Sequence, residues 1–462
     1  MFPAQVQAAF PPFFTMRLFS IVPCVLALLL LCVSGCSAAP ATKPLTKPIA
    51  KSTAPISNFK LSVYFNAHAH PQNLPLSRVL ADLAGHGVTR IVVLSQIYNE
   101  WAPLGLHRLA KEWGIEIVIS NLLNPLTYDK NVSTATLAQR NEKDMKALIA
   151  RVNAQPFPEV VTAWYAADEA EYSFKKTDVP DAEIRLRNFV SLIKRLDPKR
   201  KVIVNHDARN SQWGGFFKLG EDESWCSVFW ANSYATNFLK KQLAGLQANS
   251  KVPVTLVYGA QNMSGESGEI LRELLQTYGL ENISPEEARK RSVRQDVADY
   301  IVNSQRVGAQ GAALFTYDGY YDYTYYSMVD ERGRSKEGKM EGVRDAVETL
   351  SANSGAPSLQ VKITPSAFLP LPRTLTIETI AAPNATTKTP LQSVQVFVSD
   401  NGGHSWQAVK AFSKPNQTVT FELPHDWQRP NWMMVRARVF DGNKYSLWSV
   451  WNALPWSPPN AS

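Results

Sequence analysis

The sequence contains no run of basic residues interleaved with aromatic ones, the pattern that follows a nucleic-acid backbone. Its formal charge of +8 comes from lysines and arginines scattered along 462 residues. We therefore expect no nucleic-acid partner and interpret the charge as that of a solvated surface, with some attraction to anionic surfaces. Hydrophobic residues make up 45% and charged residues 19% of the chain, which is typical of a globular protein. A chain of this length predicts two domains with appendages.

An export signal is the clearest feature near the N-terminus. A positive region opens at Met16, an almost unbroken apolar run covers 21–32, and Val33-Ser-Gly-Cys36 follows. The run is too short for a stable transmembrane span and is typical of a signal peptide. The last four residues resemble the bacterial lipobox, which implies that Cys36 receives a diacylglycerol and becomes the mature N-terminus. We expect 1–35 to be the lipoprotein signal, with Met16 as the true start.

Cysteine is too scarce for a disulfide framework or a cysteine zinc site. Of the four cysteines, Cys24 and Cys32 leave with the signal and Cys36 carries lipid. Cys226 then remains alone, so no disulfide is expected even in an oxidising compartment. By the usual sorting pattern of such lipoproteins, Ser37 does not favour retention in the inner membrane. We therefore expect a cell-envelope protein anchored to the membrane by its lipid, at the outer membrane of a Gram-negative cell.

The composition changes twice along the rest of the chain. Residues 36–57 are rich in Ala, Pro, Thr, Lys and Ser and predict a disordered linker behind the lipidated cysteine. Residues 58–350 alternate β-rich runs with helical stretches in roughly eight βα units, the rhythm of a TIM barrel. Residues 358–455 carry short alternating strands and no helix pattern, which predicts a β-sandwich. The expected fold class is α/β, a (β/α)8 TIM barrel followed by a small all-β sandwich.

The positions of the expected elements follow from the hydrophobic pattern. The barrel strands are expected at 61–65, 90–94, 115–119, 160–165, 201–205, 227–230, 252–257 and 312–316. Helices are expected at 76–86, 134–153 and 182–196. In such a barrel the working residues follow the carboxyl ends of the strands, so the search for chemistry begins there.

Four segments are similar to a known family, in the order in which that family has them. "AWYAADEAE" closes the fourth strand, "LDPKRKVIVN" leads into the fifth, "SVFWANSY" carries the sixth and "VGAQGAALFTYDGY" the eighth. Over Phe59 to Leu350 the chain resembles the glycoside-hydrolase-like TIM-barrel superfamily. This resemblance implies that Glu169, at the end of strand four, is the general acid. It also implies that a set of neighbouring residues shapes the sugar subsite: Asp168, Asn205, Tyr234 and Tyr317.

Hydrolysis of a glycosidic bond requires a carboxylic acid that protonates the leaving oxygen and a second carboxylate that attacks the sugar or activates water. Burial against aromatic walls raises the pKa of such an acid, and Trp164, Trp230 and Tyr317 are candidates for those walls. The tyrosines after strand eight, Tyr320 among them, suit stacking on sugar rings. A packed loop with satisfied hydroxyl groups explains them equally well.

The seventh strand lacks the glutamate that family enzymes commonly place at its end as nucleophile. Gly259 and Gln261 stand there, and Gln261 is expected to contact substrate instead. Asp318 after strand eight or Asp207 after strand five can replace the missing acid, each implying a different carboxylate separation and stereochemistry. Two functions stay open: a hydrolase that cleaves an oligo- or polysaccharide, and a lipoprotein that binds glycan without cleaving it.

His68 and His70 at the end of strand one offer a third function. Side chains two residues apart on a strand point to the same face, so both can reach one metal ion. "NAHAHP" resembles strand one of metal-dependent amidohydrolase barrels, and His206 falls on strand five, where that superfamily also has a ligand. The set is incomplete, because strand six shows Asn232 and Tyr234 in place of histidine. We rank the lining of a sugar pocket first for these histidines, and expect no metal and no cofactor.

The C-terminal domain carries a marker of its own. The segment from Ser399 to Trp406 resembles the Asp-box turn, with Asn401 in the position of the aspartate. That turn ties a β-hairpin and does not identify an activity. "VRARVFDGNKYSLWSVW" resembles the last strands of a fibronectin type III or immunoglobulin-like module. We expect a spacer or binding accessory without catalysis.

Overall fold

The structure is a computed structural model, and it describes most of the chain from Phe59 to Asn452. The described residues are 59–65, 76–120, 122, 127, 129–177, 179, 181–207, 216–228, 236–259, 293–317, 327–329, 335–365, 374–400, 405–409, 412, 414–423 and 433–452. Among them no helix is both long enough and apolar enough to span a bilayer.

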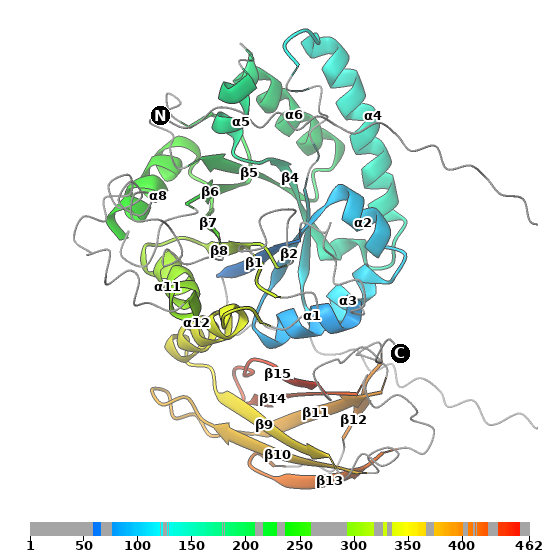
Figure 1. Ribbon diagram of the computed structural model, residues 1–462, viewed down its shortest axis with the longest axis vertical. Helices are drawn as coiled ribbons and strands as arrows, with labels where there is room; N and C mark the ends of the chain where they lie inside the picture. The colour runs from blue at the N-terminus through cyan, green and yellow to red at the C-terminus, as the bar shows by residue number, and fades with distance from the viewer. Residues whose placement is uncertain are drawn as a thin grey trace, which may run out of the picture. The chain divides into compact units, whose positions relative to one another are not determined.

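Eight parallel strands form a closed barrel in the order in which they occur in the chain (Figure 1). They are β1 (Lys60–Phe65), β2 (Arg90–Leu94), β3 (Glu116–Ser120), β4 (Val161–Ala167), β5 (Lys201–Asp207), β6 (Glu223–Ser227), β7 (Val254–Gly259) and β8 (Gly311–Phe315). Pairing of β8 with β1 closes the barrel, with Lys60 opposite Gly311 and Val63 opposite Leu314. The predicted (β/α)8 barrel is confirmed.

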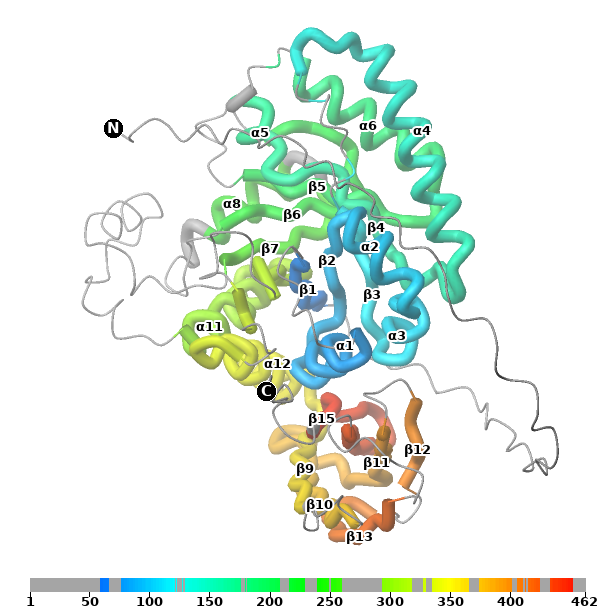
Figure 2. Tube along the Cα trace, turned by 45° about the vertical axis from the view of Figure 1, so that its right-hand side comes forward, coloured from blue at the N-terminus to red at the C-terminus, as the bar shows by residue number. Residues whose placement is uncertain are grey.

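Helices surround the strands (Figure 1). They are α1 (Leu76–Gly85), α2 (Ser95–Trp101), α3 (Leu106–Trp113), α4 (Thr134–Asn153), α5 (Ala170–Thr177), α6 (Ala182–Leu196), α8 (Thr236–Ser250), α11 (Val293–Arg306) and α12 (Lys339–Asn353), with a short 3-10 turn η2 (Pro158–Val160) before β4. Both views show α4 beside α6 and α11 beside α12 (Figure 1 and Figure 2). The Ser133 hydroxyl caps α4 by accepting from the Thr136 backbone N–H at 3.1 Å, so this long, largely polar helix begins where its sequence predicts.

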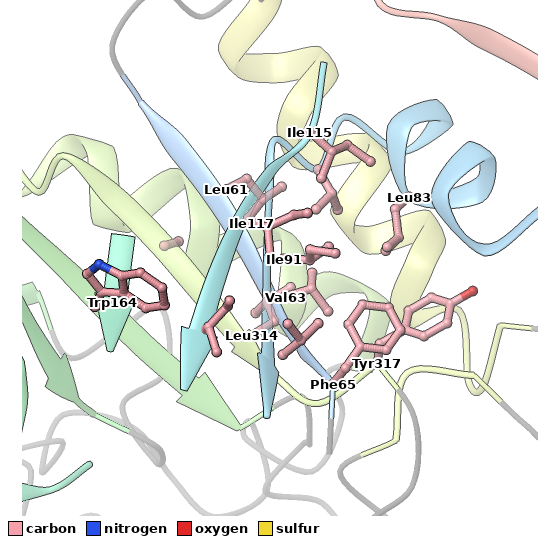
Figure 3. Close-up of a cluster of buried hydrophobic side chains, with 14 of the residues drawn as sticks. Leu61, Val63, Phe65, Leu83, Ile91, Ile115, Ile117, Trp164, Leu314 and Tyr317 are labelled. Carbon is pink, nitrogen blue, oxygen red and sulfur yellow. The ribbon is translucent and has the colours of Figure 1, made fainter. Parts of the chain in front are cut away.

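Strand side chains alternate between the inside of the barrel and the layer under the helices. The inner set is largely aromatic and β-branched and fills the barrel as a core: Tyr64, Val92, Val118, Ala163, Tyr165, Ile203, Trp225, Val257 and Ala313. The outer set packs against the helices (Figure 3), where Leu61, Val63 and Phe65 of β1 share a cluster with Leu83 of α1. Residues one apart in a strand therefore face different environments.

A charged layer closes the amino end of the barrel. Arg90 Nη1 donates to Glu223 Oε1 at 2.8 Å and Arg90 Nε to Glu116 Oε2 at 3.1 Å, and Lys60 also bonds Glu116. The indole of Trp225 donates to Glu223 as well, at 2.8 Å. Burial disfavours the carboxylate form, yet the charge of Arg90 outweighs it and lowers the pKa of Glu223.

Gly311 makes the close packing of this end possible. A Cβ atom at Gly311 would lie 2.6 Å from the backbone oxygen of Lys60 and 2.8 Å from Thr255 Oγ1. Only glycine therefore fits at this point, where β8 meets both of its neighbouring strands.

The predicted sixth strand is wrong in its limits. The expected range was 227–230, whereas β6 ends at Ser227 and begins at Glu223. The strand opens with a charged residue because Arg90 neutralises that residue inside the barrel. The apolar run that suggested a strand begins only where β6 ends, so Asn232 and Tyr234 do not directly follow the strand.

The C-terminal strands form two antiparallel sheets, of three and four strands, in the orders β13-β10-β9 and β12-β11-β14-β15. The strands are β9 (Ser358–Pro365), β10 (Thr374–Ala382), β11 (Ser393–Ser399), β12 (Gln407–Ala408), β13 (Thr418–Glu422), β14 (Met434–Phe440) and β15 (Ser449–Asn452). Leu375 and Ile377 of one sheet share a buried core with Val396 and Val435 of the other. The predicted small all-β sandwich is confirmed, and its kinship with fibronectin type III or immunoglobulin-like modules stays a prediction.

The buried Arg90 pairs generate a stability prediction. Arg90→Leu leaves Glu223 buried without its cation, which costs about 3–5 kcal/mol of unfolding free energy. Lys111→Leu is the matched control, because Lys111 and Glu159 pair at 2.8 Å with side chains 52% and 56% exposed, and such pairs contribute about 0–1 kcal/mol. Urea unfolding followed by circular dichroism measures both. Equal losses in the two variants would contradict the buried layer.

Candidate functional site

The carboxyl end of the barrel is the candidate site, and the structure describes part of it. The ends of β4 and β5 are described, together with the last inward residues of the other strands. Several predicted residues lie outside the described part of the chain: Cys36, His68, His70, Trp230, Tyr234, Gln261, Asp318 and Tyr320. Their roles stay predictions.

A chain of hydrogen bonds crosses the barrel mouth. The Tyr64 hydroxyl donates to the Tyr165 hydroxyl at 2.8 Å, and Tyr165 donates to Asp168 Oδ1 at 2.6 Å. Asn205 Nδ2 donates to the same Asp168 oxygen and to Ser227 Oγ, each at 2.7 Å. Residues of four strands thus form one hydrogen-bonded layer around the Asp168 carboxylate, made of Tyr64, Tyr165, Asn205 and Ser227. We call this layer, with Asp168, the polar floor.

The phenols of this floor are held in their protonated form. Burial raises the pKa of both Tyr64 and Tyr165 well above the ordinary value, and the charge of Asp168 raises them further. Both tyrosines therefore remain protonated hydrogen-bond donors at neutral pH. Asp168 is itself exposed, so its side chain is accessible to a ligand above the floor.

Glu169, the predicted general acid, directly follows Asp168 in the sequence. Its backbone has φ of 42°, in the left-handed region that residues other than glycine rarely adopt. Its carbonyl oxygen accepts the Ser173 backbone N–H at 3.0 Å, so the residue turns the chain from β4 into α5. Such strain costs on the order of 1–3 kcal/mol and concentrates at functional sites. The charge of Glu169 also contributes to the raised pKa of Tyr64, after burial and the charge of Asp168.

Asp207, the last residue of β5, supplies a second carboxylate. It shares the inward face of the strand with Asn205 and Ile203, and it is 2% exposed. Burial raises the pKa of the Cys226 thiol, and the charges of Asp207 and Glu169 both add to this shift. Glu169 follows β4 and Asp207 ends β5, so two of the predicted catalytic residues stand at the ends of neighbouring strands, and their roles stay predictions.

Trp164 and Tyr317 lie away from the mouth, in the layer under the helices (Figure 3). The Trp164 indole donates to Asp197 Oδ2 at 3.0 Å, and the Tyr317 hydroxyl donates to Asp82 Oδ2 of α1 at 3.1 Å. Both side chains are fully buried. The structure thus corrects the expectations that Trp164 forms an aromatic wall beside the acid and that Tyr317 lines the sugar subsite, because each occupies the outer position of its strand or strand end.

His206 also lies on the outer face and not in the mouth. Its Nδ1 is 2.7 Å from Glu171 Oε1 and its Nε2 is 3.3 Å from Glu221 Oε1, with the ring fully buried. Burial lowers the pKa of His206, but the two carboxylates outweigh this effect and raise it to about 9. The residue is a buried imidazolium and cannot contact a substrate, which corrects its predicted role.

The described residues contain no group of three or more His, Cys, Asp or Glu side chains arranged to hold a metal ion. In the amidohydrolase alternative, His206 was to share a metal with His68 and His70. Its two ring nitrogens are both occupied by glutamates, so His206 does not fit that role.

The sequence does not predict Tyr64 and Ser227 as members of the floor, nor Glu171 as the partner of His206. The alternation of β1 indicates that Tyr64 points inward with Ser62. Ser227 was placed at the start of strand six instead of its end. Nothing in the local sequence indicates the partner of Glu171, because its contacts come from residues 35 to 46 positions away.

No protein-family model matches the sequence, and no curated protein matches it. Solved structures to which the chain is similar include glycoside hydrolases. A β-glucuronidase of Bacteroides uniformis matches at 13% identity with a TM-score of 0.40, over 81% of this chain and 43% of its own. The exo-β-1,4-mannosidase Op5Man5 from Opitutaceae bacterium strain TAV5 matches at 14% identity with a TM-score of 0.43. The match covers 65% of this chain and 61% of the mannosidase. A β-D-glucuronidase of Dictyoglomus thermophilum matches at 15% identity with a TM-score of 0.40. The match covers 63% of this chain and 50% of that enzyme.

The chain therefore spans about half the length of these solved structures. With TM-scores from 0.40 to 0.43, the similarities leave the activity to be inferred from the residues of this chain.

The raised pKa of His206 generates a prediction of pH dependence. The folded pKa of about 9 exceeds the ordinary 6.5, so the ion pairs stabilise the fold fully below about pH 6.5. This contribution is lost as pH rises through 9. His206→Gln should thus be most destabilising at pH 6 and progressively less so towards pH 9.5, as measured by urea unfolding across that range. A difference from the wild type that does not change with pH would count against the charged imidazolium.

Proposed function

We propose that this protein is a glycoside-hydrolase-like protein that cleaves O-glycosidic bonds of an oligo- or polysaccharide, with Glu169 as general acid. The observation that carries the proposal is that Glu169 and Asp207 stand at the ends of the neighbouring strands β4 and β5. Both lie beside a polar floor that presents Asp168 to a ligand. The resemblance of the fourth-strand segment to glycoside-hydrolase-like barrels supports the same assignment.

Each residue then has a defined chemical role. Glu169 donates its proton to the leaving glycosidic oxygen, and Asp207 attacks the sugar or activates a water molecule. Asp168 accepts hydrogen bonds from sugar hydroxyl groups, while Tyr165 and Asn205 hold its carboxylate in place. An acceptor fixed before the substrate arrives orients the sugar without reorganisation during the reaction.

Removal of the general acid should affect hydrolysis to a degree that depends on the leaving group of the substrate. Glu169→Gln should lower kcat/KM about 10²–10⁴-fold on unactivated oligosaccharides, because the leaving oxygen is no longer protonated. Activated nitrophenyl glycosides should be much less affected, since nitrophenolate leaves without a proton. Asp207→Asn should lower the rate on both substrates. Steady-state hydrolysis of a panel of glycosides measures these effects.

Glu142→Gln is the control, because Glu142 forms surface ion pairs with Lys146 and Arg195 on α4 and α6. Hydrolysis unchanged in Glu169→Gln would reject the proposed acid. Binding of the same glycans without cleavage by the wild type would make the protein a glycan-binding lipoprotein.

We also propose that the protein is held at the cell envelope by lipid on Cys36, as its lipobox-like segment indicates. Expressed in a Gram-negative bacterium, the wild type should incorporate labelled palmitate and sediment with membranes. Cys36→Ser should do neither, whereas Cys226→Ser should behave as the wild type, because Cys226 is a buried residue of β6. Sedimentation of Cys36→Ser with the membranes would contradict the anchor.

A further inference from the structure

Glu171 is buried beneath the ends of β4 and β5, although glutamate is rarely buried without partners. Its carboxylate accepts three hydrogen bonds. Oε2 accepts from the Asp207 backbone N–H at 3.1 Å, and Oε1 accepts from the Phe217 backbone N–H at 2.8 Å and from His206 Nδ1 at 2.7 Å. Glu171 thus ties helix α5 to the end of β5 and to the segment that leads into β6.

His206 extends this link to the next strand. Its Nε2 lies 3.3 Å from Glu221 Oε1, and the same oxygen accepts from Ser224 Oγ at 2.5 Å. His206 is fully buried and the ring of Phe216 packs against it at 5.6 Å between centroids. Water is excluded from these ion pairs, so they are stronger than surface pairs. Glu171, His206 and Glu221 form one buried cluster, which we call the rear clamp.

The rear clamp is attached to both candidate catalytic carboxylates through the backbone. Glu171 follows Glu169 by two residues in α5, and His206 directly precedes Asp207 in β5. Neighbouring strand residues point to opposite faces, so His206 points outward under α5 while Asp207 points into the mouth. Helix α5 packs against β5, next to β4 (Figure 1). The clamp therefore holds, from behind, the two chain segments that carry the carboxylates.

We propose that Glu171 and His206 are positioning residues that set the separation between Glu169 and Asp207. This inference rests on the proposed function. Neither residue reaches a substrate, because both lie buried on the outer face. The separation of two carboxylates decides whether the second attacks the sugar directly or through a water molecule. A displacement of about 1 Å at a reacting group lowers the rate by roughly 100-fold.

The charges around His206 agree with this role. Glu171 faces it from α5, Glu221 from the segment before β6 and Cys226 from β6, while Asp207 is its neighbour in β5. Burial and the surrounding carboxylates raise the pKa of Cys226, which therefore stays a neutral thiol. Glu171 and Glu221 thus keep His206 protonated up to a pH of about 9, where the imidazole loses its proton.

The test compares three variants of the full chain on a glycoside that the wild type hydrolyses. Glu171→Gln and His206→Gln remove parts of the clamp. Asp197→Asn is the matched control, since Asp197 is 5% exposed and accepts from Trp164 Nε1 and Arg200 Nη1 at the opposite end of β5. Both clamp variants should lower kcat about 10–100-fold with KM changed less than about twofold. The control should lose stability and keep its kcat.

Two further measurements separate positioning from general loss of structure. On nitrophenyl glycosides, whose leaving group needs no proton from Glu169, the wild-type kcat should fall as pH rises through about 9, and this fall should be absent from His206→Gln. Amide hydrogen exchange at Asp207 and Phe217 should be faster in Glu171→Gln, because both amides lose their acceptor. If Glu171→Gln does not fold, His206→Gln carries the comparison, since it leaves both amides bonded to Glu171.

The outcomes distinguish the two proposals. Suppose that the two clamp variants have the same kcat as Asp197→Asn while Glu169→Gln is inactive. This result would overturn the positioning role and leave the proposed function intact. A Glu169→Gln variant as active as the wild type on unactivated oligosaccharides would overturn both. Reduced kcat at unchanged KM in the clamp variants alone, with normal kcat in Asp197→Asn, supports the positioning role.

Discussion

The buried pair of Arg90 and Glu223 is the constraint on which the rest of the barrel depends. A closed barrel of parallel strands has an interior too narrow to leave empty, so every inward side chain must find a partner. At the amino end charges neutralise one another, and in the middle Trp225 and Tyr165 fill the space edge to face, with ring centroids 5.4 Å apart. At the carboxyl end, the described polar groups gather around Asp168.

The sequence predicts the architecture well because alternating β-rich and helical segments leave little choice of fold. It predicts the site less well, and the first group of errors has one cause. Asn205 and Asp207 lie inward as expected, but His206 between them points outward, as does Trp164 beside Tyr165. A motif of consecutive residues carries both faces of a strand at once. Which residues of a strand point into the barrel and which point outward becomes clear only when the neighbouring strands are in place.

Contacts over long distances in the sequence account for the remaining errors. The sixth strand was misplaced because Glu223 appears too polar for a barrel interior, and only Arg90, 133 residues away, makes it suitable. The cluster around Glu171 has the same origin. Its neutralisation comes from β5 and from the segment before β6, so no local pattern distinguishes this buried glutamate from an exposed helical one. In this barrel a charged side chain is buried where a segment distant in the sequence supplies its partner.

The left-handed backbone of Glu169 has an evolutionary consequence. Glycine and asparagine adopt this conformation with little or no strain, whereas glutamate is held there at a cost in stability. A lineage that no longer needed the carboxylate would gain stability by exchanging it for one of those two residues. Under the proposed function, the need for the carboxylate is what keeps glutamate at this turn. Among related sequences, glycine or asparagine here would mark the branches in which that need has ended.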